Sequence, residues 1–231
     1  MRIDILTLFP EEFEGVIGSS IIKRAVEGHQ VEIYVHDYRE YSSKKSKRVD
    51  DYSYGGGAGM IIEPQPIVDC LKNIPDYDKA LKLITNPIGK TFNQKKAENL
   101  AQLDHIIIVC GHYEGIDHRI MDYVDEPISI GDYILTGGEI PAMVIIDSVI
   151  RLLPNVLGNN ESSHDESFEN NLLEYPQYTR PVEYDGKKVP DVLLSGNHKK
   201  ITDWKLEEAK KITKERRIDI WEKYLKKRLK D

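Results

Sequence analysis

Cysteine is scarce in this chain. Its 231 residues include only Cys70 and Cys110, which lie forty positions apart and form no CxxC motif. This usage disfavours a disulfide scaffold and a cysteine zinc site, and it favours a reducing cytoplasm as the location. Cys110 ends an apolar, strand-like run, where a place in the core is the simpler interpretation.

Long apolar runs and a leader segment are also missing. Ile106–Cys110 and Ala142–Ile146 are among the longest apolar runs, and both are far too short to span a bilayer. Met1–Leu6 passes straight into a strand-like pattern, with no basic leader or cleavage site. We therefore expect no membrane partner.

Signatures of phosphate binding and metal catalysis are missing as well. Neither a GxxxxGK[S/T] loop nor a GxGxxG fingerprint occurs. His112 and His118 lie six apart, which is not the i, i+4 spacing of a helical zinc site. We expect no protein-bound metal, and neither a Ser-His-Asp nor a Cys-His arrangement can be inferred.

Charge is distributed unevenly along the chain. The net charge of −7 by itself argues against a nucleic-acid partner. However, residues 199–231 contain thirteen Lys or Arg and seven Asp or Glu, a local balance of +6. A second basic cluster comprises Lys44, Lys45, Lys47 and Arg48. Such asymmetry points to a polyanion, although lysine-rich helices with solvated faces give the same pattern.

Strand-like and helix-like segments alternate through residues 1–150, which predicts an α/β fold with a mostly parallel sheet. Two helices are expected, Gln94–Leu103 after the capping residue Asn93 and Ala142–Leu153 between Pro141 and Pro154. The predicted strands are rich in β-branched residues. They are Ile3–Phe9, Val31–Val35, Leu81–Thr85 and His105–Cys110.

The composition and periodicity of the sequence change near Gly158. A polar, aperiodic stretch follows, and after Gly196 come basic helical segments. Their core candidates are Trp204, Ala209, Ile212, Ile218, Trp221 and Leu225. We expect an α/β domain at residues 1–158, a flexible linker at 159–172, and a small helical basic domain at 173–231.

Three glycine-bearing segments each come after a predicted strand. They are residues 86–90, 111–115 and 129–139. Loops at the carboxyl ends of strands form the ligand crevice of an open α/β sheet, where glycine lets the backbone approach a ligand. Together they favour a pocket for a cofactor without phosphates, although each alone is ordinary turn chemistry. A fourth loop, Asp50–Met60, has four glycines in five positions and suits a segment that orders around a large partner.

These segments, in this order, resemble the bacterial tRNA (guanine-N1)-methyltransferases that modify position 37. The matching stretches cover nearly the whole chain, and the third is highly specific. They are Tyr54–Met60, Gly111–Asp117, Ser129–Glu139, Tyr178–Pro181 and Val189–His198.

The resemblance implies a SPOUT-type domain with a deep trefoil knot and a homodimer whose active sites lie at the subunit interface. It implies that the knot loops bind S-adenosylmethionine, and it allows for magnesium, for which the sequence shows no ligand set. Asn86 and Ile88 depart from the family's usual Ser and Gln. By motif, the cofactor contacts fall on Pro87, Gly111, Tyr113, Glu114, Ile130, Gly131, Asp132, Tyr133, Ile134, Leu135, Gly138 and Pro141.

The resemblance also implies the catalytic groups. A carboxylate takes the proton of guanine N1, and Arg151 stabilises the charge that spreads onto O6. Asp147 lies one helical turn before Arg151 and is placed to orient it. The family's base precedes a Ser-Phe pair; here Glu166 precedes Ser167-Phe168 and Asp165 stands one place earlier. Both carboxylates stay candidates.

The expected partner is the anticodon stem-loop of tRNA, held through its phosphates by basic groups. The candidate RNA-binding residues are Lys44, Lys45, Lys47, Arg48, Gly57, Asn197 and His198. Two alternatives remain. One is an RNA-binding protein that has lost the chemistry, and the other is a related methyltransferase that acts at another RNA position.

Overall fold

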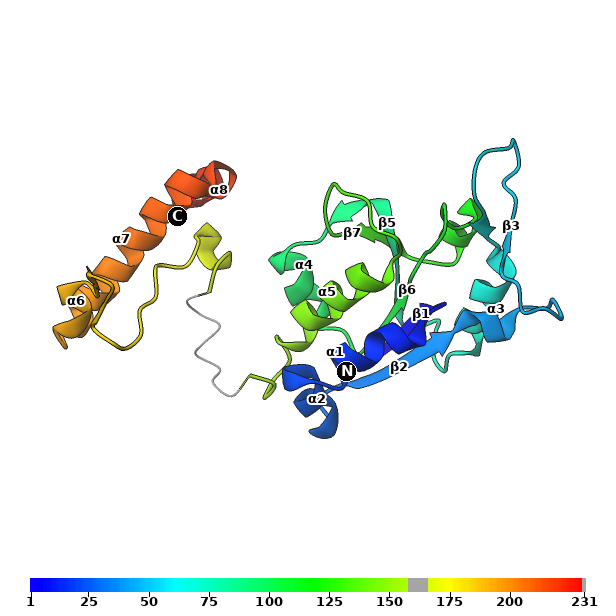
Figure 1. The fold of residues 1–231 in the computed structure, drawn as a ribbon, viewed down its shortest axis with the longest axis horizontal. Coiled ribbons are helices and arrows are strands. Elements are labelled where there is room, and N and C mark those ends of the chain that lie inside the picture. Colours follow the sequence, from blue (N-terminus) through cyan, green and yellow to red (C-terminus); the bar gives the residue numbers. More distant parts are fainter. Residues whose placement is uncertain (158–165, 230–231) are drawn as a thin grey trace. The chain divides into compact units, whose positions relative to one another are not determined.

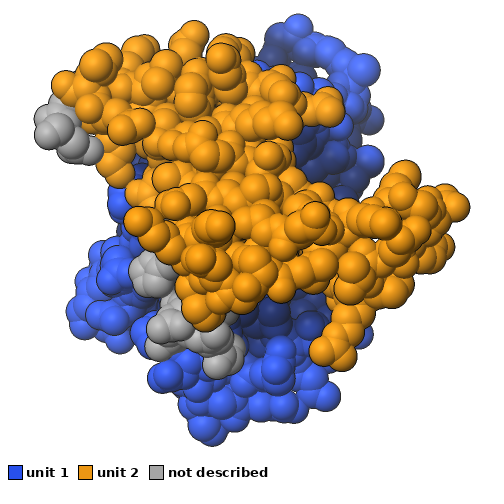
Figure 2. All heavy atoms as spheres, turned by 90° about the vertical axis from the view of Figure 1, so that its left-hand side faces the viewer, with its two compact units in different colours: residues 1–158 blue, residues 159–231 orange. Residues whose placement is uncertain are grey.

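The computed structural model describes residues 1–157 and 166–229 (Figure 1). The chain forms two compact units, Met1–Gly158 and Asn159–Asp231. They are coloured separately in Figure 2. None of the described helices is both long and apolar enough to cross a membrane.

The first unit alternates strands with helices. Its strands are β1 (Arg2–Thr7), β2 (Glu32–Asp37), β3 (Asp50–Asp51), β4 (Ile61–Ile62), β5 (Leu81–Thr91), β6 (His105–Val109) and β7 (Glu126–Ser129). Its α-helices are α1 (Glu14–Ile17), α2 (Ser20–Glu27), α3 (Pro64–Asn73), α4 (Gln94–Leu100) and α5 (Glu139–Ile150). Three 3₁₀ helices complete it: η1 (Pro10–Phe13), η2 (Tyr38–Tyr41) and η3 (His118–Asp122).

Five of these strands form one parallel sheet in the order β2-β1-β6-β5-β7. The predicted α/β fold with a mostly parallel sheet is confirmed, and each of the four predicted strands is present within a few residues. β3 and β4 make a separate antiparallel pair. The trefoil knot implied by the resemblance stays a prediction.

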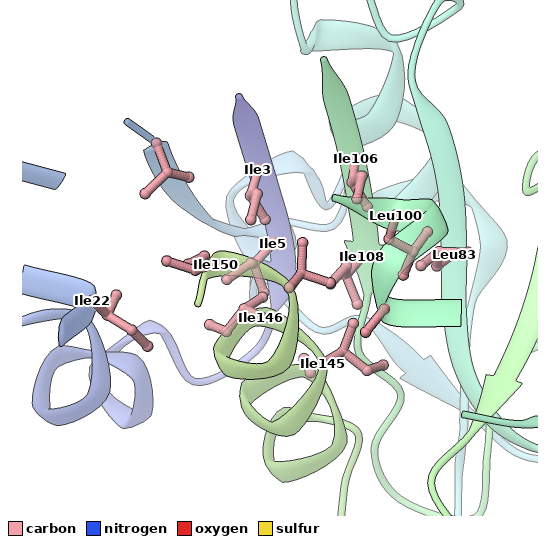
Figure 3. Close-up of a cluster of buried hydrophobic side chains, with 14 of the residues drawn as sticks. Ile3, Ile5, Ile22, Leu83, Leu100, Ile106, Ile108, Ile145, Ile146 and Ile150 are labelled. Carbon is pink, nitrogen blue, oxygen red and sulfur yellow. The ribbon is translucent and has the colours of Figure 1, made fainter. Parts of the chain in front are cut away.

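Helices cover both faces of the sheet, and alternate residues of its central strands point to opposite sides. Ile106 and Ile108 of β6 pack with α2, α4 and α5 in one cluster. Ile107 and Val109 pack with α3, η2 and η3 in the other. Figure 3 shows the first cluster, where side chains of α5 lie against β1 and β6. The run of four apolar residues in β6 thus reflects two covered faces.

Two predicted helices are present with shifted bounds. Asn93 caps α4 as expected, its Oδ1 accepting from Lys96 N at 3.0 Å. The helix expected at 142–153 begins at Glu139 and ends at Ile150, three residues early at both ends. Pro141 therefore lies inside the first turn, where a missing N–H costs nothing because that turn has no intrahelical acceptor.

The second unit contains α6 (Asp191–Leu194), α7 (His198–Arg216) and α8 (Ile218–Arg228). It also has η4 (Glu169–Asn171) and a hairpin of β8 (Glu183–Tyr184) and β9 (Lys187–Lys188). Its buried residues include Leu172, Ala209, Thr213 and Ile220. Within the predicted linker, Phe168 N donates to Leu172 O at 2.7 Å.

Part of the predicted core of this unit is wrong. Ile218 is 60% exposed and Leu225 is 43% exposed, while Ile220 is buried. Arg217 has φ −139° and separates α7 from α8. Because the helix is interrupted there, the apolar spacing of α7 does not continue into α8. Residues chosen by that spacing therefore lie on the exposed face of α8.

Candidate active site

A cavity of about 350 Å³ lies beside residues 85–87 of β5 and at the carboxyl ends of β6 and β7. The carboxyl ends of strands are where open parallel sheets bind ligands, and the volume is within the range of small-molecule sites. Residues 85–87, the loop after β6, and the end of β7 with the loop after it supply the walls, and the start of α5 closes the cavity. The lining residues are Thr85–Pro87, Gly111–Ile116, Ile128–Gly131, Tyr133–Gly138 and Pro141.

The structure brings eleven of the twelve predicted cofactor residues together around this cavity. They are Pro87, Gly111, Tyr113, Glu114, Ile130, Gly131, Tyr133, Ile134, Leu135, Gly138 and Pro141. Asp132 does not line the cavity and is exposed. That these residues bind the methyl donor stays a prediction.

Gly138 is required by close packing of two loops. Its N–H donates to Gly111 O at 2.7 Å. A Cβ at this position would lie 2.0 Å from Thr85 Oγ1 and 2.8 Å from Gly111 N. Any side chain here would therefore force the α5 start away from Thr85 of β5 and from the loop that follows β6.

The loop within β5 leaves the sheet and returns to it. Ile128 of β7 is the register partner of both Thr85 and Lys90, so residues 86–89 arch out of the ladder. Asn86 shapes the arch, because its Oδ1 accepts from Ile88 N at 3.0 Å. Asn86 thus makes a local turn at the point where this chain departs from the family's usual serine.

The loop after β6 holds a strained residue and joins a second loop. Tyr113 has φ +59°, a region that costs a non-glycine residue about 1 kcal/mol or more. Glu114 N donates to Met60 O at 3.1 Å, and Ile62 N donates to Gly115 O at 3.0 Å. The glycine-rich loop that ends at Met60 is thereby fixed to the wall of the cavity.

Behind the cavity lies a buried polar cluster that the sequence did not indicate. Thr7 Oγ1 donates to Glu139 Oε1 at 2.8 Å, and Phe9 N donates to Thr7 Oγ1 at 3.0 Å. Glu139 Oε2 lies 3.8 Å from His112 Nδ1. Thr7 and Glu139 are both buried. The sequence gives little sign that these two residues meet, since Thr7 ends a strand and Glu139 has the position of an ordinary acidic residue in the first turn of a helix.

The cavity wall carries little positive charge. None of its lining residues is Lys or Arg, so the described wall offers no cation to a phosphate group. Burial raises the pKa of the Cys70 thiol to about 12 and that of Cys110 well above its usual value. Neither thiol is a nucleophile at neutral pH. Within residues 1–157 and 166–229, no group of three His, Cys, Asp or Glu side chains is placed to hold a metal ion.

Arg151, one of the predicted catalytic residues, does not line the cavity wall. It caps the carboxyl end of α5, with its backbone N donating to Asp147 O at 3.2 Å. It lies ten positions after the lining residue Pro141, so its Cα is about 15 Å farther along the helix axis. Glu166 is half-buried, and Asp165 lies outside the described residues.

The basic cluster of residues 44–48 is largely matched by acids. Lys44 Nζ lies 2.8 Å from Glu63 Oε1, Lys47 Nζ lies 3.3 Å from Glu40 Oε2, and Arg48 Nε lies 3.4 Å from Asp50 Oδ1. Lys45 is exposed, as is Gly57. An RNA phosphate would have to compete with these surface pairs, each of which contributes little to stability.

The other two candidate RNA contacts begin α7. Asn197 caps this helix, because its Oδ1 accepts from Lys200 N at 3.1 Å. His198 is the first residue of the helix and is exposed. The Asn197 side chain therefore has a structural role whatever it contacts besides.

A parallel α/β sheet with a ligand-sized cavity near the carboxyl ends of its strands is typical of ligand-binding α/β proteins. Comparison with known proteins gives the family. The model of the tRNA (Guanine-1)-methyltransferase TrmD family matches residues 1–223. The chain belongs to this family.

Several curated relatives support the assignment. A tRNA (guanine-N(1)-)-methyltransferase of Clostridioides difficile is 52% identical over 227 residues, which cover 96% of this chain and 98% of the relative. Those of Halalkalibacterium halodurans and Geobacillus kaustophilus are 55% and 54% identical. They cover 96% and 97% of this chain, and 92% and 93% of the relatives.

Proposed function

We propose that this protein transfers the methyl group of S-adenosylmethionine to N1 of guanine 37 in tRNA, next to the anticodon. The observation that carries the proposal is the single cavity wall formed by eleven of the predicted cofactor residues, ten from three separate segments together with Pro141. Family membership supports the reaction class, and the position in tRNA follows from the resemblance.

The cavity suits the chemistry of the donor. S-adenosylmethionine carries a sulfonium cation and an adenosine group but no phosphate. The wall accordingly offers apolar side chains and backbone groups instead of Lys or Arg. Gly111, Ile130 and Gly138 bring backbone close to the ligand, and Tyr113 with Leu135 supply apolar surface. When bound, the donor supplies an electrophilic methyl group.

The reaction needs one proton acceptor. The N1 lone pair forms the new bond to the methyl carbon, and sulfur keeps the electrons of the broken C–S bond. The N1 proton passes to a carboxylate, for which Asp165 and Glu166 are the candidates. Arg151 stabilises the negative charge that develops on O6.

The position of Arg151 supports an active site built from two copies of the chain. Within one chain α5 carries this residue about 15 Å along the helix axis from Pro141, which argues against both acting on one guanine within a single subunit. α5 also exposes apolar surface, with Ile140 50% and Val144 41% exposed. A homodimer that buries this face would bring Arg151 of one subunit to the cavity of the other.

The second unit supplies basic surface for the tRNA backbone. Residues 199–231 have a local charge of +6, and α7 begins with His198 followed by Lys199 and Lys200. Phosphate contacts of this kind give affinity and register but little sequence reading. Discrimination of guanine then comes from contacts to an extruded base.

A methylation assay separates this proposal from its alternatives. Radiolabelled S-adenosylmethionine is incubated with unmodified tRNA that has guanine at position 37, and the modified nucleoside is mapped. N1-methylguanosine at position 37 supports the proposal. Methylation elsewhere would favour a related enzyme, and tRNA binding without methyl transfer would favour an RNA-binding protein that has lost the chemistry.

A further inference from the structure

Glu139 is a buried carboxylate one layer behind the cavity. Its side chain is only 3% exposed, and Thr7 Oγ1 is its hydrogen-bond donor. Glu139 does not itself line the cavity, but its neighbours Gly137, Gly138 and Pro141 do. A charge in such a place is costly unless something compensates it.

The compensation in this structure is incomplete. His112 Nδ1 is buried without a hydrogen-bond partner and faces Glu139 Oε2 across 3.8 Å. The imidazole packs against Phe9, with ring centroids 4.7 Å apart, so its place is fixed from behind. His112 also lines the cavity, which makes it the direct link between the carboxylate and any ligand.

The loop is built to allow this contact. A Cβ on Gly137 would lie 2.2 Å from Glu139 Oε2 and 2.7 Å from His112 Nδ1. Glycine at position 137 therefore lets the backbone cover the pair without separating the two side chains. α5 begins at Glu139, and its N-terminal dipole further favours a negative group there.

From these contacts we propose that the buried carboxylate of Glu139, which faces His112 at the cavity wall, makes the cavity prefer a cationic ligand to a neutral one of the same shape. This proposal rests on the proposed function, in which the ligand is a sulfonium before methyl transfer and a neutral thioether after it. Glu114 also lines the cavity, but its exposed carboxylate is screened by water, whereas that of Glu139 is not. The site would thus retain S-adenosylmethionine and release S-adenosylhomocysteine.

The test compares the affinities of these two ligands by calorimetry in the intact protein. We expect Glu139→Gln to weaken S-adenosylmethionine binding about tenfold and to change S-adenosylhomocysteine binding less than about twofold, because only the former interacts with the missing charge. Glu98→Gln is the matched control. Glu98 is an exposed carboxylate that pairs with Lys95, so its loss changes the net charge equally without altering the ratio.

If Glu139→Gln weakens the binding of both ligands by the same factor, Glu139 is merely structural. If it changes the binding of neither ligand, the proposal is also overturned. If Glu139→Gln does not fold, Thr7→Val removes the hydroxyl that holds the carboxylate in place. Because a displaced carboxylate interacts less with the ligand, the ratio of the affinity for S-adenosylmethionine to that for S-adenosylhomocysteine should fall by a smaller factor. A folded Thr7→Val protein with the wild-type ratio would count against it. A wild-type protein that binds neither ligand would contradict the proposed function instead.

Discussion

Thr7 donates a hydrogen bond of 2.8 Å to Glu139 although 132 residues separate them. The bond ties the carboxyl end of β1 to the first turn of α5, and both side chains are buried. Because the start of α5 also closes the cavity, the stability of the domain and the shape of the ligand site depend on the same contact.

Thr7→Val should therefore destabilise the first unit. The substitution keeps the shape but leaves a buried carboxylate oxygen without its donor, which costs about 1–3 kcal/mol. Urea unfolding followed by circular dichroism measures the loss. Thr7→Ser retains the hydroxyl and serves as the control; if both variants lose the same stability, the hydrogen bond is not responsible.

Gly138→Ala should disrupt ligand binding. The new Cβ would meet Thr85 Oγ1 at 2.0 Å and Gly111 N at 2.8 Å, so the cavity wall at β5 and the loop after β6 must shift. We expect S-adenosylmethionine to bind at least about tenfold more weakly, a loss of about 1.4 kcal/mol. Gly15→Ala is the control, since nothing lies within 4 Å of its added Cβ. Equal affinity in the two variants would contradict the proposed placement of the ligand.

Periodicity was sufficient to predict the layers of the first unit. The β-branched runs and the cap at Asn93 are local signals, and the parallel sheet follows from their alternation with helices. Two of the segments that meet at the cavity follow strands and the third arches out of β5, so parallel topology brings them together. Eleven of the twelve cofactor residues indicated by the motif resemblance line the cavity, and Asp132 does not. Other lining residues, including His112 and Gly137, were not indicated.

The contacts that depend on tertiary structure could not be predicted in this way. No local pattern joins Thr7 to Glu139, and the break at Arg217 that exposes Ile218 depends on how α8 packs. The pairing of Lys44 with Glu63 likewise joins residues nineteen positions apart. The sequence therefore indicates the basic cluster as a candidate RNA contact but does not show that much of it is matched by acids.

The carboxylate of Asp4 should make stability depend on pH. Burial opposes its ionisation, but hydrogen bonds from His36, Arg2 and His105 outweigh that and hold the pKa of Asp4 well below its usual range. A lowered folded-state pKa gives stability that is present above the unfolded value, about 3.9, and is lost as pH falls through the folded value.

Asp4→Asn should accordingly cost about 3 kcal/mol at pH 7, because it leaves a buried cluster without its anion. The difference from wild type should shrink as the pH falls below about 4. Urea unfolding at several pH values tests this. Asp76→Asn, which removes an exposed partner of Lys79, should change stability little at any pH. A difference for Asp4→Asn that stays constant with pH would contradict the account.

A composite active site predicts complementation between inactive variants. Glu114→Ala should damage the cavity and Arg151→Ala the catalytic group, so each homodimer should be inactive. In a mixed dimer one site takes both intact residues, so co-expression should restore about a quarter of wild-type activity. If every site lies within one chain, the mixture stays inactive. Two differently tagged chains allow the mixed dimer to be purified and assayed.

The central claim is tested most directly by methyl transfer to tRNA with guanine at position 37, compared with the same tRNA carrying adenine there. We predict N1-methylguanosine at position 37 in the first and no methylation in the second. Arg151→Ala and one of Asp165→Ala or Glu166→Ala should lower the rate by about a hundredfold or more while S-adenosylmethionine still binds. Equal methylation of the two tRNAs, or none of either by a wild-type protein that binds both substrates, would contradict the account.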